Sequence, residues 1–162
     1  MMSMLRKLYR DKRGSMAIET ALVAPVLMAL AMGGFEVSAM VARQSELQSA
    51  AAEAAAVARA VIPDTTEKQN TVRDIVATSV CNGTSPTISE AGAATCETAT
   101  VTITPKYRCG IVDDYTTVSN CPSDTEYQFI SVTIQDNYTP LWTQFGVGTA
   151  MNFNITRTVQ IG

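Results

Sequence analysis

The sequence predicts an α+β protein with one long amino-terminal helix, one short helix and a small antiparallel β-sheet. Residues 15–62 are apolar in their first half and alanine-rich in their second half, which is typical of a long helix. Three later segments alternate polar and apolar residues with a period of two, which is typical of strands that bury one face. The length of 162 residues fits one modest domain with an accessory segment.

The net charge of −3 is an average over two unlike parts of the chain. Residues 1–14 carry five basic residues and one acidic residue, a net charge of +4, whereas the remaining residues carry −7. No basic patch lies beyond residue 13, which argues against nucleic-acid binding. The chain contains no histidine, which excludes a Ser-His-Asp triad, a histidine-ligated metal and an imidazole pH switch. We therefore expect a protein without enzymatic activity, cofactor or metal.

An apolar segment follows the basic residues directly. Only Glu19 and Glu36 are charged within residues 15–42, and a helix of this length is sufficient to cross about 30 Å of hydrocarbon. The basic residues precede the segment, so the positive-inside rule predicts a cytoplasmic amino terminus and an extracytoplasmic carboxy-terminal part. Pro25 removes one backbone hydrogen bond of this helix and predicts a kink there. A plain membrane anchor and a signal peptide cleaved after Ala31 are alternative interpretations.

The residues around Gly14 resemble the prepilin-peptidase site of type IV pilins and pseudopilins. A glycine follows the basic leader, and Glu19 lies in the apolar helix five residues later. The resemblance implies cleavage between Gly14 and Ser15, where glycine leaves the backbone accessible to a protease. A carboxylate in an apolar segment normally has a function and a partner. The implied partner of Glu19 is the new α-ammonium of Ser15, in the same or a neighbouring subunit, and an interfacial ion pair with Lys12 or Arg13 is the alternative.

The wider amino-terminal sequence resembles TadE-like pseudopilins, which are minor components of the tight-adherence (Tad) pilus. The resemblance covers residues 13–36 and includes the run Leu22-Val23-Ala24-Pro25-Val26-Leu27. It implies a pilin-like fold and a role in the initiation or tip of an adhesive pilus. The implied partners are the prepilin peptidase, other pilins and minor pseudopilins, and the assembly platform in the bacterial inner membrane. The alternative is a membrane-anchored extracytoplasmic binding domain that does not enter a filament.

The long helix is predicted to continue past the membrane to residue 62, where Pro63 ends it. Neither glycine nor proline interrupts residues 43–62. One face of this part carries apolar residues at helical spacing, namely Leu47, Ala51, Ala54, Ala58 and Val61. We expect this face to pack on the protein's own globular part, and packing against other filament subunits is the alternative.

Residues 63–162 are predicted to form the extracytoplasmic globular domain. Residues 64–67 offer a capping box for a helix at about 66–79. The predicted buried face of this helix contains Val72, Ile75, Val76, Ser79 and Val80. Alternating runs at residues 98–104, 127–134 and 152–159 predict three antiparallel strands.

The four cysteines, at positions 81, 96, 109 and 121, lie in the predicted extracytoplasmic part, where disulfides form. Four cysteines allow three pairings, and we favour Cys81 with Cys96 and Cys109 with Cys121. No pair has the C-x2-C spacing, which argues against a zinc site and against thiol redox catalysis.

The densest apolar and aromatic cluster outside the membrane segment lies between the last two predicted strands. Its members are Tyr138, Pro140, Leu141, Trp142 and Phe145. We expect this connection to cover the core, and an exposed patch that contacts a partner pseudopilin or the pilus tip is the alternative.

Overall fold

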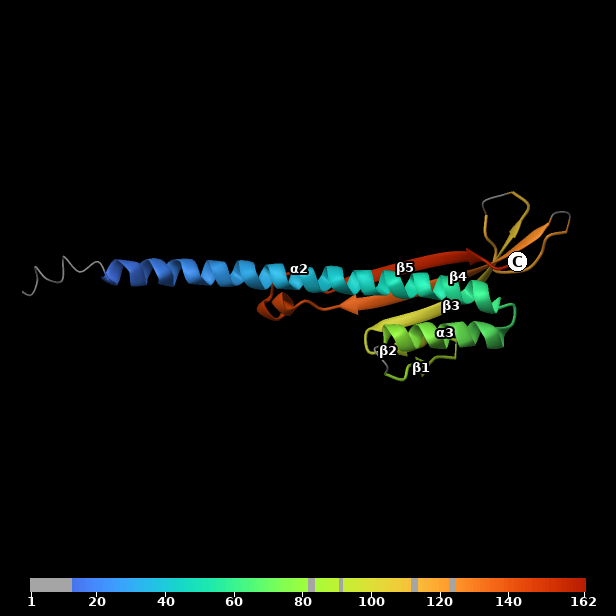
Figure 1. Cartoon of the computed structure of the whole chain (residues 1–162), viewed down its shortest axis with the longest axis horizontal. Helices are drawn as coiled ribbons and strands as arrows, with labels where there is room; N and C mark the ends of the chain where they lie inside the picture. Colours follow the sequence, from blue (N-terminus) through green and yellow to red (C-terminus); the bar gives the residue numbers. More distant parts are fainter. Residues whose placement is uncertain (1–12, 82–83, 91, 112–113, 123–124) are drawn as a thin grey trace, which may run out of the picture. The chain divides into compact units, whose positions relative to one another are not determined.

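The computed structural model describes residues 13–81, 84–90, 92–111, 114–122 and 125–162, with backbone only at residues 13–15. Its elements are the helices α2 (Arg13–Val61) and α3 (Thr66–Val80), the strands β1 (Thr87–Ile88), β2 (Ala94–Cys96), β3 (Ala99–Cys109) and β4 (Glu126–Tyr138), the 3-10 helix η1 (Leu141–Phe145), and the strand β5 (Met151–Gln160). They confirm the predicted α+β class (Figure 1). The first twelve residues of the expected leader lie outside the described residues. The chain divides into two compact units, residues 1–39 and residues 40–162.

The end of α2 agrees with the expected effect of proline. The helix ends at Val61, two residues before Pro63, which cannot donate a backbone hydrogen bond. Ile62 adopts a positive φ of 49°, and its backbone N–H still donates to the Ala58 carbonyl at 3.0 Å. This left-handed residue ends the helix in the way that a C-terminal cap does.

The start of α3 differs from the predicted capping box. Thr65 is the N-cap, and its hydroxyl accepts a hydrogen bond from the Lys68 backbone N–H at 3.4 Å. Lys68, rather than Glu67, therefore occupies the third helical position, and the predicted box at residues 64–67 was wrong by one residue. The Lys68 ammonium instead forms an ion pair of 2.8 Å with Asp64.

The sheet is an antiparallel meander in the order β1-β2-β3-β4-β5. β3, β4 and β5 correspond to the three predicted strands; β3 begins one residue later and ends five residues later than predicted, and β4 and β5 extend beyond both predicted limits. β1 and β2 were not predicted, because strands of two and three residues are too short to show an alternating pattern. In the register, Val101 pairs with Ile134 and Ile103 pairs with Val132, so these side chains share one face of the sheet.

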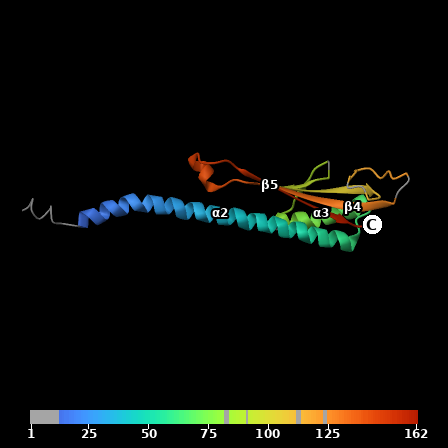
Figure 2. The same cartoon turned by 90° about the horizontal axis from the view of Figure 1, so that it is seen from above.

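Residues 40–61 of α2 and the whole of α3 cover that face of the sheet (Figures 1 and 2). Four residues of the predicted apolar face of α2 are fully buried in the core: Leu47, Ala51, Ala54 and Ala58. They share the core with the β4 residues Ile130, Val132 and Ile134. This confirms the expectation that this face packs on the protein's own globular part. Alanine side chains allow the backbones of the packed elements to approach closely.

The buried face of α3 differs from the prediction at two positions. Val72, Val76 and Val80 are buried as expected, but Ile75 and Ser79 are exposed, and Arg73 and Ala77 are buried. Positions 73 and 77 lie on one side of the line that residues 72, 76 and 80 form along the helix, and positions 75 and 79 lie on its other side. The sequence assignment of Ile75 and Ser79 to the core was therefore wrong.

Two disulfides link the ends of elements in the second unit. Cys81, directly after α3, pairs with Cys96 at the end of β2, with a Cα–Cα distance of 5.9 Å. Cys109, at the end of β3, pairs with Cys121 in the following loop, with a Cα–Cα distance of 5.5 Å. The first bridge lies at the edge of the core, and the second bridge lies at one end of the sheet.

Candidate functional site

The amino-terminal part of α2 exposes apolar side chains on all of its faces. They include Met16, Ile18, Leu22, Val26, Leu30 and Phe35, each at least half exposed. A helix that is apolar all round requires an apolar environment, such as a membrane or the helices of other subunits. Among the described residues, one helix, α2 from Met16 onward, is long and apolar enough to cross a membrane.

The hydroxyl groups in this part of α2 are satisfied within the helix. Thr20 donates to the Met16 carbonyl at 2.8 Å, and Ser38 donates to the Gly34 carbonyl at 2.9 Å. A hydrogen bond to the carbonyl four residues earlier gives the hydroxyl an acceptor where no water is present. The segment is therefore compatible with an apolar environment except at its carboxylates.

Glu19 is the one charged residue between positions 16 and 35, and its side chain is exposed. It lies in α2, one turn after the backbone of Gly14 and Ser15. The side chains of Lys12, Arg13 and Ser15, which are its candidate partners, lie outside the described residues. Pro25 lies inside α2, with helix on both sides of it.

A second polar feature lies where the chain enters the second unit. The Arg43 guanidinium Nε donates to Asp136 Oδ2 of β4 at 2.7 Å, and the Thr98 hydroxyl donates to Asp136 Oδ1 at 2.7 Å. Arg43 also donates to Glu46 Oε2 at 2.9 Å and, through Nη2, to the Val80 carbonyl at 3.5 Å. One arginine thus joins α2, the end of α3 and β4, and we call Arg43, Asp136 and Thr98 the polar junction.

Burial acts to lower the pKa of Arg43, but the hydrogen bonds from its guanidinium to Asp136 and Glu46 outweigh that effect and raise the pKa. The guanidinium is therefore charged at all physiological pH values, and the buried Asp136 carboxylate has a permanent counter-ion.

Sequence reasoning did not identify the polar junction. A signal was nevertheless present, because residues 130, 132, 134 and 136 alternate with the polar residues at positions 131, 133 and 135 along one strand. Three of these positions are apolar, and Asp136 is the fourth, so a carboxylate was to be expected on the buried face. A buried carboxylate needs a cationic or hydrogen-bonding partner. The identity of that partner, Arg43, depends on the tertiary fold.

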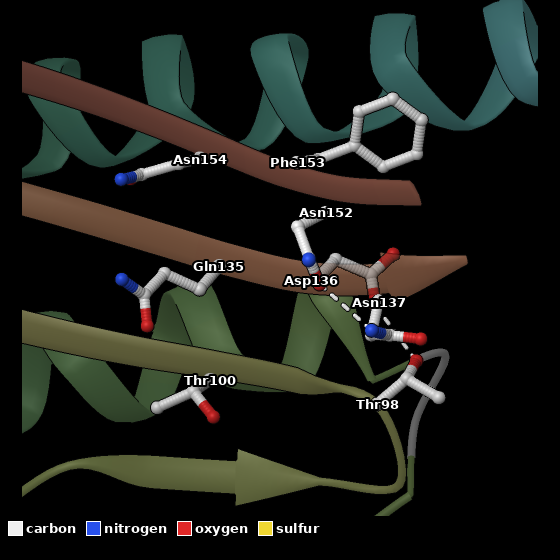
Figure 3. Close-up of a pocket in the computed structure, with 8 residues that line it drawn as sticks. All are labelled: Thr98, Thr100, Gln135, Asp136, Asn137, Asn152, Phe153 and Asn154. Atoms are coloured by element: carbon white, nitrogen blue, oxygen red, sulfur yellow. Dashed lines mark hydrogen bonds between the residues drawn. The ribbon is translucent and has the colours of Figure 1, made fainter. Parts of the chain in front are cut away.

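Over the part of the strands nearer the polar junction, the face of the sheet opposite the helices is polar. The alternate residues there carry hydroxyl and amide groups along three strands, among them Thr100, Thr102 and Thr104 of β3, Thr133 and Gln135 of β4, and Asn154, Thr156 and Thr158 of β5. At the edge near the polar junction, a hollow of about 360 Å³ is lined by Thr98, Thr100, Gln135, Asp136, Asn137, Asn152, Phe153 and Asn154 (Figure 3).

The chemistry that this hollow offers is hydrogen bonding. Asn137 Nδ2 donates to Asn152 Oδ1 at 2.7 Å, and Asp136 is already paired with Arg43 and Thr98 (Figure 3). Acid–base catalysis needs a titratable group that is available to a substrate. Both carboxylate oxygens of Asp136 already accept hydrogen bonds, one from Arg43 and one from Thr98. Within the part of the chain that the structure describes, no three metal-ligating side chains come together.

The aromatic cluster between β4 and β5 is only partly buried. Pro140 is buried, Tyr138 and Trp142 are half-buried, and Phe145 is 71% exposed. The expectation that this connection covers the core therefore holds for Pro140 and is wrong for Phe145. Gly146 and Gly148, both with φ of 74°, adopt the left-handed conformation that glycine tolerates, and Gly146 ends η1 directly after Phe145.

Comparison with known proteins gives one match. Residues 14–56 match the family described as TadE-like protein. A search of the curated proteins and a search of the solved structures each gave no match. The matched segment lies entirely within α2 and contains Gly14, Ser15, Glu19, Pro25 and Arg43. The similarity to this family is thus confined to residues 14–56, and it is consistent with a TadE-like protein of a Tad pilus system.

Proposed function

We propose that this protein is a minor pseudopilin that takes part in the initiation or the tip of a Tad-type adhesive pilus. The prepilin peptidase cleaves it between Gly14 and Ser15, and residues 15–62 then act as the transmembrane and assembly helix. Before assembly, residues 63–162 lie outside the inner membrane, with the amino terminus in the cytoplasm. Its partners are the peptidase, the assembly platform, and other pilins and minor pseudopilins.

One observation supports this proposal most strongly. The family match begins at Gly14 and coincides with a continuous helix whose first part is apolar on all faces, apart from Glu19. A carboxylate at that depth is costly unless a partner neutralises it. Cleavage after Gly14 creates the α-ammonium of Ser15 one helical turn away, and this is a suitable partner in the same or the preceding subunit.

The second half of α2 supports an assembly role through its other face. Leu47, Ala51, Ala54 and Ala58 pack in the core, and the exposed side carries small and polar residues, among them Ser45, Gln48, Ser49, Ala52 and Ala56. Small residues permit close approach of a neighbouring helix. The helix therefore has one face for its own domain and a second face for a neighbouring subunit.

The intact mass and the amino-terminal sequence of the protein from its native host test this proposal. We expect the chain to begin at Ser15. A chain that begins at Met32 would instead indicate a signal peptide and would overturn the proposal. An unprocessed chain would also overturn it, in favour of a membrane-anchored binding domain that stays outside filaments.

A further inference from the structure

The connection between β4 and β5 presents an uncharged apolar surface to solvent. No residue from Asn137 to Thr156 is charged. Within this stretch Phe145 is 71% exposed and Val147 is 62% exposed, and Met151 at the start of β5 is exposed as well. Neighbouring exposed apolar side chains commonly mark a contact with a membrane or a partner.

The fold holds these side chains outward. The Thr143 hydroxyl donates to the Pro140 carbonyl at 2.7 Å, and the Val147 backbone N–H donates to the Trp142 carbonyl at 3.2 Å. Trp142 also lies against Gly148, where an added Cβ would come within 3.1 Å of the indole nitrogen. Because this turn is closed by its own bonds, the exposure of Phe145 and Val147 is a property of the folded loop.

The polar junction shows at which end of the second unit this loop lies. Asp136 is near the last residue of β4 and contacts Arg43, which lies three residues after the point where the chain enters the second unit. The loop that follows β4 therefore leaves the sheet at the end where the chain enters the second unit. The loop between β3 and β4, with Ile111 and Val118, lies at the opposite end because the strands are antiparallel.

From these observations we infer that residues 139–150 insert into the headgroup region of the membrane that α2 crosses. The inference rests on the proposed membrane insertion of residues 16–41. Tryptophan and tyrosine favour the boundary between hydrocarbon and water, and Trp142 and Tyr138 are at or next to this loop. Phe145 and Val147 add apolar surface that gains free energy in the acyl boundary. The loop is thus a second membrane contact that orients the globular domain on the bilayer.

Trp142 is the only tryptophan of the chain, so it reports directly on this loop. The experiment uses the full chain, reconstituted into vesicles of phosphatidylcholine and phosphatidylglycerol that contain lipid brominated either near the headgroup or deep in the acyl chain. We expect strong quenching of Trp142 fluorescence by the shallow bromine, weaker quenching by the deep bromine, and protection from acrylamide in water.

Two double variants make the test specific. Phe145→Ser with Val147→Ser should lose most of the quenching by shallow bromine, since the apolar anchors are removed. Ile111→Ser with Val118→Ser removes two exposed apolar side chains at the opposite end of the sheet and should leave the quenching unchanged. Circular dichroism and thiol titration verify that both variants keep the fold and the two disulfides.

The outcomes separate this inference from the proposed function. Protein that remains in the vesicles after alkaline carbonate extraction but shows no quenching by either bromine overturns the loop contact alone. Protein that carbonate extracts overturns the membrane-spanning helix and with it both proposals. Acrylamide protection that depends on protein concentration rather than on lipid would assign the loop to a second copy of the chain and would also overturn the lipid contact.

Discussion

Arg43 and Asp136 lie 93 residues apart in the chain and form an ion pair of 2.7 Å. The pair joins α2 to β4 next to the point where the apolar segment ends. The Asp136 carboxylate is buried, and its partners are the Arg43 guanidinium and the Thr98 hydroxyl. This contact fixes the end of the globular domain at which the chain enters it, three residues before Arg43.

Removal of Arg43 should therefore destabilise the globular domain. Arg43→Met leaves a buried carboxylate without its counter-ion, and we expect a loss of about 3 kcal/mol in the free energy of unfolding. Urea denaturation of the detergent-solubilised chain measures this loss. Arg43→Met combined with Asp136→Leu should recover most of the stability, since no charge is then buried. Glu46→Gln is the matched control, because Glu46 is exposed and its loss should cost less than about 1 kcal/mol.

The two disulfides should differ in what their removal changes. Each closes a short loop, with sequence separations of 15 and 12, so chain entropy alone gives about 3 kcal/mol for each. Cys81 is buried in the core, whereas Cys109 and Cys121 are not. Replacement of Cys81 and Cys96 by alanine should therefore lower the stability of the whole domain more than the same change at Cys109 and Cys121.

Hydrogen exchange locates these effects. Loss of the Cys109–Cys121 bridge should increase exchange mainly in the part of residues 110–125 next to the bridge, while the core strands stay protected. If both replacements destabilised the core equally, the predicted difference between the two disulfides would be wrong.

Gly14→Ala should block removal of the leader, because the added methyl group obstructs the backbone that the protease must approach. Immunoblotting of membranes from the native host, with intact mass as confirmation, distinguishes the precursor from the processed chain. Ala31→Leu is the control, since it disrupts the alternative signal-peptidase site and should leave processing unchanged. If Ala31→Leu alone abolishes processing, the cleavage site lies after Ala31.

Glu19→Ala should permit processing but reduce incorporation into pili, because the proposed pair with the Ser15 α-ammonium is lost. The amount of the protein in sheared pilus fractions, compared with the amount in the membrane, measures incorporation. Glu19→Gln keeps the size of the side chain and should be equally defective if the charge is what matters, whereas Glu19→Asp should retain part of the function. Normal incorporation of Glu19→Gln would show that no ion pair is needed.

The Asp64–Lys68 pair gives a pH-dependent prediction. The hydrogen bond from the Lys68 ammonium holds the pKa of the Asp64 carboxyl below its ordinary value. The stabilisation is therefore complete above the ordinary pKa of aspartate and is lost as the pH falls through the lower pKa of the folded state. Carboxyl-carbon NMR titration of the Lys68→Met variant should show the pKa of Asp64 raised, and Lys106→Met should leave it unchanged.

Much of the fold was predictable because its signals are local. Alanine-rich sequence without glycine or proline gives helix up to Pro63, and alternating threonine and apolar residues give β3, β4 and β5. The apolar face from Leu47 to Ala58 also follows from helical spacing alone. The exposure of Ile75 and the one-residue shift of the α3 cap were not predicted. Helical spacing permits more than one choice of buried residues in α3, and both Asp64 and Thr65 are suitable N-cap residues.

The sequence by itself determined the α+β class, the long apolar helix with Glu19 inside it, and the TadE-like segment, because each depends on residues that are neighbours in the chain. The tertiary structure alone decided that Arg43 meets Asp136, that the strands leave a hydroxyl- and amide-rich face uncovered, and that Phe145 faces solvent. These relationships depend on strand register and on contacts between distant residues. Such contacts form only when burial of the common core brings the segments together, so no local pattern contains them.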